Sequence, residues 1–192
     1  MKRLILTLAA TLVASPAFAH LDPEAHGSLA AGLSHPIFGL DHVLAMIAVG
    51  LWAASLGGKD AIWFLPSAFV AAMIAGFMAA LTGLSLPFVE PTILLSVFAL
   101  GLAVAFALKL PLHIASGIVA LFGLFHGFAH GGELGSAGVL AFGIGFALST
   151  ALLHILGVAV AFGTKRILSG EKILKALGWI TAAGGFWIII SG

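Results

Sequence analysis

Residues 136–163 read SAGVLAFGIGFALSTALLHILGVAVAFG and contain no Asp, Glu, Lys or Arg. A bilayer has a hydrocarbon core of roughly 30 Å, and about 20 apolar residues in a helix are enough to cross it. This stretch is therefore long enough to span a membrane. We expect it to be helical, because hydrocarbon cannot satisfy the backbone groups of an open chain.

The composition of the whole chain agrees with this segment. Charged residues make up 8% of the 192 residues and hydrophobic residues 61%, whereas a soluble domain carries about 25% charged residues. A chain this short cannot bury so much apolar surface in a water-soluble core. The net charge of +1 excludes a basic nucleic-acid-binding surface, and the absence of Cys excludes disulfides, Cys-ligated zinc and thiol catalysis. These properties predict an integral membrane protein.

Charged residues divide the chain into six apolar segments of spanning length. We expect an all-α, polytopic membrane protein with transmembrane helices at 36–56, 61–82, 89–108, 111–131, 136–163 and 173–190. After Lys2 and Arg3 at the N-terminus, the basic residues fall only in or next to the first, third and fifth connections between these segments, at Lys59, Lys109, Lys165, Arg166, Lys172 and Lys175. The positive-inside rule makes these connections cytoplasmic, so both ends of the mature chain are expected outside.

The N-terminus has the layout of a cleavable secretory signal. A basic start at Met1-Lys2-Arg3 precedes a short apolar run, and residues 17–19 form an A-x-A site. We therefore expect a signal peptide at 1–19 and a single six-helix transmembrane domain at 20–192. This organisation places the protein in a bacterial inner membrane, with a periplasmic N-terminus after cleavage.

Two polar motifs interrupt the apolar segments. The first is HPIFGLDH at 35–42, in which Pro36 suits the first position of a helix. If the helix begins there, Asp41 and His42 lie in its second turn. His35 and His42 are seven residues apart and are expected on nearly the same helix face.

The second motif is FHGFAHGGE at 125–133, at the end of the fourth segment. His126 and His130 form an i, i+4 pair, and Glu133 follows three residues later. The predicted topology brings both motifs to the outer surface. The converging ionisable side chains are His35, Asp41, His42, His126, His130 and Glu133.

This set of imidazoles and carboxylates suits a borderline divalent cation such as Ni²⁺, Co²⁺, Zn²⁺ or Cu²⁺. Asp41 is expected either to bind the ion or to orient an imidazole. A purely structural hydrogen bond between His130 and Asp41 explains only part of the pattern. Because ionisable groups inside a membrane are costly, the combined cluster is a candidate metal site.

The remaining four histidines are candidates for a secondary path for the ion. His20 and His26 lie in the tail that follows the predicted cleavage site. His113 lies near the inner end of the fourth segment, and His154 lies toward the cytoplasmic side of the fifth. Each of them alone also fits a packing, interfacial or solvated role.

The two motifs resemble those of the HupE/UreJ family of membrane proteins, which carry H-P-x-x-G-x-D-H and F-H-G-x-A-H-G-x-E. Every fixed position is met at 35–42 and 125–133. The resemblance implies uptake of nickel, or cobalt in some members, for enzymes such as NiFe hydrogenase or urease. It also implies that the motif His, Asp and Glu residues carry the metal.

We therefore expect a secondary permease that imports Ni²⁺ or Co²⁺ from the periplasm. The expected partners are membrane lipid and the ion, which is cargo, with no prosthetic group and no nucleic acid. The chain lacks a G-x-x-x-x-G-K-[ST] motif, so ATP hydrolysis by a phosphate loop is not expected.

Two other classes of function remain open at this point. One is an intramembrane hydrolase, using either a metal-activated water or a dyad of Ser116 and His154. The other is a metal sensor or a structural subunit of a larger complex. The short loops predicted between the segments do not favour a docking surface.

Overall fold

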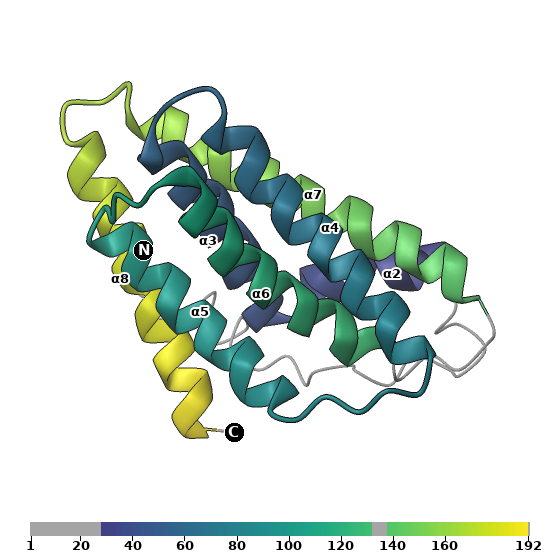
Figure 1. Cartoon of the computed structure of the whole chain (residues 1–192). Helices are drawn as coiled ribbons and strands as arrows, with labels where there is room; N and C mark the ends of the chain where they lie inside the picture. The colour runs from purple at the N-terminus through teal and green to yellow at the C-terminus, as the bar shows by residue number, and fades with distance from the viewer. Residues whose placement is uncertain (1–27, 132–137, 192) are drawn as a thin grey trace, which may run out of the picture.

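The computed structural model describes residues 28–131 and 138–191, which form a bundle of helices (Figure 1). The helices are α2 (Leu29–Phe38), α3 (Leu40–Leu56), α4 (Ala61–Leu81), α5 (Val89–Ala105), α6 (Leu112–Gly131), α7 (Val139–Thr164) and α8 (Gly170–Ser191). The predicted signal peptide at 1–19 lies outside the described residues. So do three of the predicted site residues, His20, His26 and Glu133.

The described helices include four that are long and apolar enough to cross a membrane, namely α4, α6, α7 and α8. The pair α2 and α3 meets the same test as one broken span, with a bend of 82° between its halves. Helix α5 has 17 residues and a length of about 26 Å, a few ångströms short of a typical hydrocarbon core. The chain is therefore an all-helical, multi-pass membrane protein, while the count of six spans stays a prediction.

The first predicted span differs most from the structure. The helix begins at Leu29 rather than at Pro36, because Ser28 caps it by accepting a hydrogen bond from the Ala31 N–H at 3.0 Å. Pro36 is therefore buried inside α2. The extended backbone of Gly39, with ψ of 112°, then breaks the helix before α3. The prediction that one continuous helix carries the whole first motif is wrong.

Helix α5 also ends earlier than the predicted boundary at residue 108. Ala107 adopts a left-handed conformation with φ of 48°. Its N–H donates to the Val104 carbonyl, and the Leu108 N–H donates to the Ala103 carbonyl. This pair of bonds is a Schellman motif, which terminates a helix by satisfying its last carbonyls.

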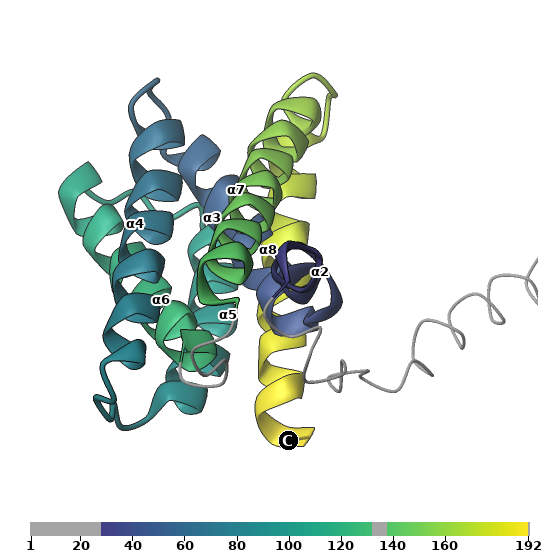
Figure 2. The same ribbon diagram turned by 90° about the vertical axis from the view of Figure 1, so that its right-hand side faces the viewer.

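The bundle is assembled from pairs of helices that pack side by side (Figure 1). Helix α4 packs on α6, α5 packs on α8, and α2 and α3 both pack on α7; Figure 2 shows α2 beside α7. A Cβ atom on Gly145 would lie 2.4 Å from the Leu29 carbonyl oxygen, and one on Gly76 would lie 2.0 Å from that of Leu124. Gly145 and Gly76 are therefore positions of close backbone approach between helices.

Two lysines from different connections meet the C-terminus of α3. Lys165 Nζ donates to the Ala54 carbonyl at 2.9 Å, and Lys109 Nζ donates to the Ser55 carbonyl. Trp52 Nε1 donates to the Leu108 carbonyl at 3.0 Å in the same region. Cations are favourable at this end of a helix, where unpaired carbonyls carry partial negative charge. The basic connections thus gather at one end of the bundle.

Candidate metal site

A series of glycines on α6 sets the position of the second motif. Cβ atoms on Gly123, Gly127 and Gly131 would lie 2.4, 1.8 and 2.3 Å from carbonyl oxygens of α4. Helix α6 therefore lies directly against the α4 backbone along this row. His126 and His130 each precede one of these glycines, and both are buried inside the bundle. The H-G pairs of the motif place an imidazole beside each point of close contact.

The break at Gly39 sets the position of the first motif. Asp41 and His42 lie in the first turn of α3, not in a second turn as predicted. Asp41 Oδ1 is 2.9 Å from His42 Nδ1. A Cβ on Gly39 would lie 2.9 Å from His42 Nδ1 and 3.0 Å from Asp41 Oδ1, so glycine leaves room for this contact. The carboxylate also lies at the helix N-terminus, where negative charge is favoured.

Three imidazoles from three helices form the centre of the candidate site. His35 on α2, His42 on α3 and His130 on α6 each offer a nitrogen, and these atoms lie within 4.8 Å of one another. The ring centroids of His35 and His130 are 4.2 Å apart, and those of His35 and His42 are 5.4 Å apart. His35 and His42 meet because the chain bends between them. The predicted reason, a shared face of one helix, is wrong.

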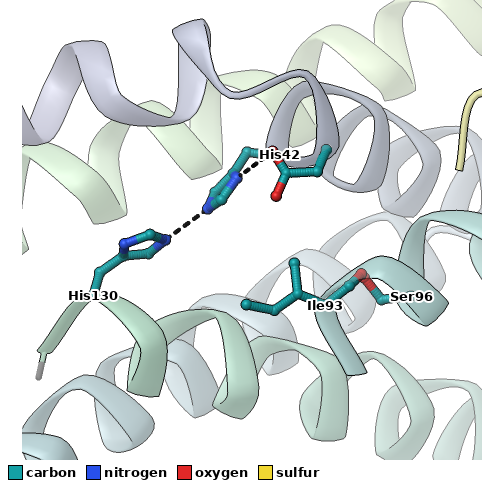
Figure 3. Close-up of polar contacts among 5 residues, drawn as sticks. His42, Ile93, Ser96 and His130 are labelled. Atoms are coloured by element: carbon teal, nitrogen blue, oxygen red, sulfur yellow. Dashed lines mark hydrogen bonds and ion pairs between the residues drawn. The ribbon is translucent and has the colours of Figure 1, made fainter. Parts of the chain in front are cut away.

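The closest contact joins His42 Nε2 to His130 Nε2 at 2.8 Å (Figure 3). Two imidazole lone pairs repel at this distance, so one nitrogen must carry a proton or a cation must bind both. Nitrogens that share one metal ion are about 3.0 to 3.4 Å apart, given metal–nitrogen bonds of about 2.0 to 2.1 Å. A shift of a few tenths of an ångström therefore converts this contact into a shared coordination site.

Asp41 is placed to orient His42. Its carboxylate contacts Nδ1, so it favours the tautomer with a proton on Nδ1 and a lone pair on Nε2, the nitrogen that faces His130. The Asp41 side chain is 23% exposed, against 6% for His42. Of the two roles predicted for Asp41, the geometry favours orientation of the imidazole.

His126 lies beside the three-histidine centre, next to His42. Its ring centroid is 5.4 Å from that of His42. Its Nδ1 is 2.8 Å from the Phe122 carbonyl, which assigns the proton to Nδ1 and leaves Nε2 as an acceptor. That Nε2 atom is buried and has no hydrogen-bond partner in the part of the chain that the structure describes. The structure thus brings five of the six predicted ligand residues together, and the sixth, Glu133, lies outside the described residues.

Aromatic rings enclose the imidazoles on the α7 side. The Phe146 ring centroid is 5.1 Å from that of His130 and 6.2 Å from that of His42. The Phe142 ring centroid is 5.9 Å from that of His35. Sequence reasoning missed both residues, because nothing in their local pattern distinguishes them from the other members of the chain's 15 Phe.

The secondary candidates are placed very differently. His113 is exposed at the start of α6, whereas His154 is fully buried on α7. Within residues 28–131 and 138–191, Ser116 Oγ and both ring nitrogens of His154 have no hydrogen-bond partner. The predicted Ser116–His154 dyad is therefore not formed, because a nucleophilic serine needs its base within hydrogen-bond reach.

Substitution of Asp41 by Asn tests its orienting role. We expect Asp41→Asn to weaken binding of Ni²⁺ to the purified protein by about 10- to 100-fold, the range for loss of a group that orients a ligand. The matched control is Asp60→Asn at the exposed α3–α4 connection. Isothermal titration in detergent measures both affinities. An unchanged affinity in Asp41→Asn would show that the carboxylate does not act on the metal site.

Together, the helices and the buried histidines define a class of protein: a multi-pass membrane protein with an imidazole cluster inside its bundle. The HupE / UreJ protein family model matches residues 8–188. The chain is 42% identical to Protein HupE of Rhizobium leguminosarum bv. viciae, over 98% of this chain and 97% of the relative. No solved structure matches it. The chain belongs to the HupE/UreJ family, as its two motifs indicated.

Proposed function

We propose that this protein is a permease that imports a divalent transition-metal ion from the periplasm, with Ni²⁺ the first candidate and Co²⁺ the second. The observation that carries the proposal is the cluster of His35, His42 and His130, whose ligand atoms lie within 4.8 Å of one another. Neutral imidazoles bind borderline ions of this kind well. Nickel itself is preferred on the family resemblance.

The proposed site has an inner and an outer part. His126 and Asp41 stand beside the three-histidine centre, each next to His42, and Glu133 belongs to the proposal on its place in the motif alone. Binding at such a site has to be moderate, because a conducting site must release its ion. The ion is cargo, and the proposal includes no prosthetic group and no enzymatic step.

The orientation of the protein follows from its charges. Along α3, Ser55 lies about 20 Å from His42, and Lys109 and Lys165 bind at the Ser55 end. The positive-inside rule makes that end cytoplasmic and the histidine end periplasmic. The proposal counts α2 with α3 as the first of six spans and α5 as the third. Both mature termini are then outside, after removal of residues 1–19 from the single domain at 20–192.

The membrane potential is a sufficient driving force for import. A divalent cation gains about 4.6 kcal/mol on crossing inward at 100 mV. A serine-dependent intramembrane hydrolase is not supported, because the Ser116–His154 dyad is not formed. In the cell, the imported metal would supply a nickel enzyme such as NiFe hydrogenase or urease.

Metal-resolved uptake into proteoliposomes tests the proposal. We expect Ni²⁺ to enter faster under an inside-negative potential than without one, with Co²⁺ and Zn²⁺ measured in the same preparation. Mg²⁺ should be excluded, because it prefers oxygen ligands and dehydrates reluctantly. Liposomes carrying the His42→Ala variant provide the control. Ni²⁺ flux no greater than in that control would refute the permease.

A further inference from the structure

A second group of buried imidazoles lies deeper in the bundle than the three-histidine centre. His126 on α6 and His154 on α7 are 0% and 1% exposed. Among the described residues, the Nε2 atom of His126 and both ring nitrogens of His154 have no hydrogen-bond partner. An unpaired buried polar group destabilises the folded protein, and within a membrane no water compensates for it. These nitrogens therefore need an explanation, and a bound cation supplies one.

The two imidazoles are linked through one phenylalanine. The Phe69 ring centroid on α4 lies 5.3 Å from that of His126 and 5.1 Å from that of His154. His126 in turn lies beside His42 of the metal centre, at a centroid distance of 5.4 Å. A continuous series of rings therefore runs from His130 through His42, His126 and Phe69 to His154.

The series leads away from the periplasmic end of α3. A Cβ on Gly50 would lie 2.2 Å from the His154 carbonyl oxygen, so residue 154 is level with Gly50. Gly50 is two turns below His42, or about 12 Å along the helix. His154 thus lies at the depth that an ion must pass between the outer centre and the cytoplasmic lysines.

The backbones on both sides of Phe69 are held in place. One turn from it on α4, Met73 Sδ accepts a hydrogen bond from Thr150 Oγ1 of α7 at 3.6 Å. Gly123 of α6 leaves no room for a side chain against the Phe69 carbonyl, with a Cβ distance of 2.4 Å. The Phe69 side chain lies between the two imidazoles and is itself fully buried, so a turn of its ring requires the side chains packed around it to shift.

We propose that His126 and His154 form an inner binding station for the transported divalent cation: the ion reaches His126 directly from the outer centre and passes on to His154 when the Phe69 ring between these two imidazoles turns aside. This inference rests on the proposed function. The ion exchanges imidazole ligands one at a time: His42 and His130 release it to His126, and His154 accepts it on the cytoplasmic side. Because successive sites offer similar imidazole ligands, the difference in binding free energy between them is small, as conduction requires.

Replacement of His154 separates ligand chemistry from packing. His154→Phe keeps a ring of similar size without nitrogens, whereas His154→Cys restores a ligand for soft and borderline metals. We expect His154→Phe to bind Ni²⁺ at the outer centre within about threefold of the wild type and to lower uptake into proteoliposomes by at least about tenfold. His154→Cys should recover a measurable part of that uptake. The matched control is Ile155→Ala, the neighbouring position, which is 60% exposed.

The introduced thiol gives a second, direct readout. The chain has no cysteine of its own, so a membrane-permeant thiol reagent reports on position 154 alone in His154→Cys. Saturating Ni²⁺ should slow this labelling at position 154 and leave labelling of Ile155→Cys unchanged.

The outcomes distinguish the two proposals. If His154→Phe takes up Ni²⁺ at the wild-type rate, or if Ni²⁺ does not change the labelling rate of His154→Cys, the inner station is overturned and the permease proposal is unaffected. Absence of Ni²⁺ uptake by the wild-type protein would overturn the permease itself. Ni²⁺ affinity at the outer centre serves as the folding check. If His154→Phe loses that affinity, the variant is misfolded, and the thiol labelling of His154→Cys then tests the inner station in its place.

Discussion

The His42→Ala variant is expected to bind Ni²⁺ more than about 100-fold more weakly than the wild type, since loss of an orienting group alone costs 10- to 100-fold. His42 contacts both a carboxylate and other imidazoles of the site. Its Nε2 lies 2.8 Å from His130 Nε2, its Nδ1 contacts Asp41, and its ring lies beside that of His126. Removal of this one side chain therefore disconnects the centre from both its orienting group and its inner neighbour. Isothermal titration of the purified protein and uptake into proteoliposomes measure the two effects.

The control for this variant is His113→Ala, which removes an exposed imidazole at the start of α6. It should bind and transport Ni²⁺ as the wild type does. The double variant His42→Ala/His130→Ala should be no worse than His42→Ala, because residues that act as one unit are not additive. Normal uptake by the double variant would contradict the proposed site.

The Gly127→Ala variant is expected to destabilise the bundle by about 3 kcal/mol, near the upper end for overpacking. The added Cβ would lie 1.8 Å from the Met73 carbonyl oxygen and 2.6 Å from its carbonyl carbon. Because these are backbone atoms, they cannot rotate out of the way, and α6 must move off α4. His126 and His130 flank this contact, so weaker Ni²⁺ binding should accompany the lower stability. Thermal unfolding in detergent and titration with Ni²⁺ measure both.

Gly117→Ala is the matched control, because Gly117 lies on the same helix and has nothing within 4 Å of its added Cβ. It should unfold at the wild-type temperature or slightly above, as alanine favours helix more than glycine does. Equal stability of Gly127→Ala and Gly117→Ala would show that α4 and α6 are farther apart than described.

The helical segments were largely predictable because each depends on residues close together in the chain. Long uncharged runs gave α4, α6, α7 and α8 to within a few residues. The start of α2 and the end of α5 differ from the predicted boundaries because they depend on local features other than the charge pattern. Ser28 caps α2, which therefore begins at Leu29, seven residues before the expected start at Pro36. Ala107, a residue that seldom takes a positive φ, ends α5 early.

The candidate site was predictable in its members and much less so in its geometry. The two motifs identified His35, His42, His126 and His130 because ionisable residues are rare in apolar segments. Their spacing did not reveal that Gly39 separates His35 and His42 onto two helices. Phe69 and Phe146, which contact the imidazoles, carry no local sign of that role.

The sequence by itself determined that this chain is a helical membrane protein, that its basic residues lie in or next to alternate connections and which side chains are available to bind a metal. Hydropathy and charge set these properties residue by residue. Only the tertiary structure decided that His35, His42 and His130 meet across three helices, that Asp41 contacts His42, and that His154 joins the series through Phe69. These relations depend on how closely the helices approach at glycines such as Gly50 and Gly127. That approach is a property of two surfaces in contact, which the pattern along one helix does not contain.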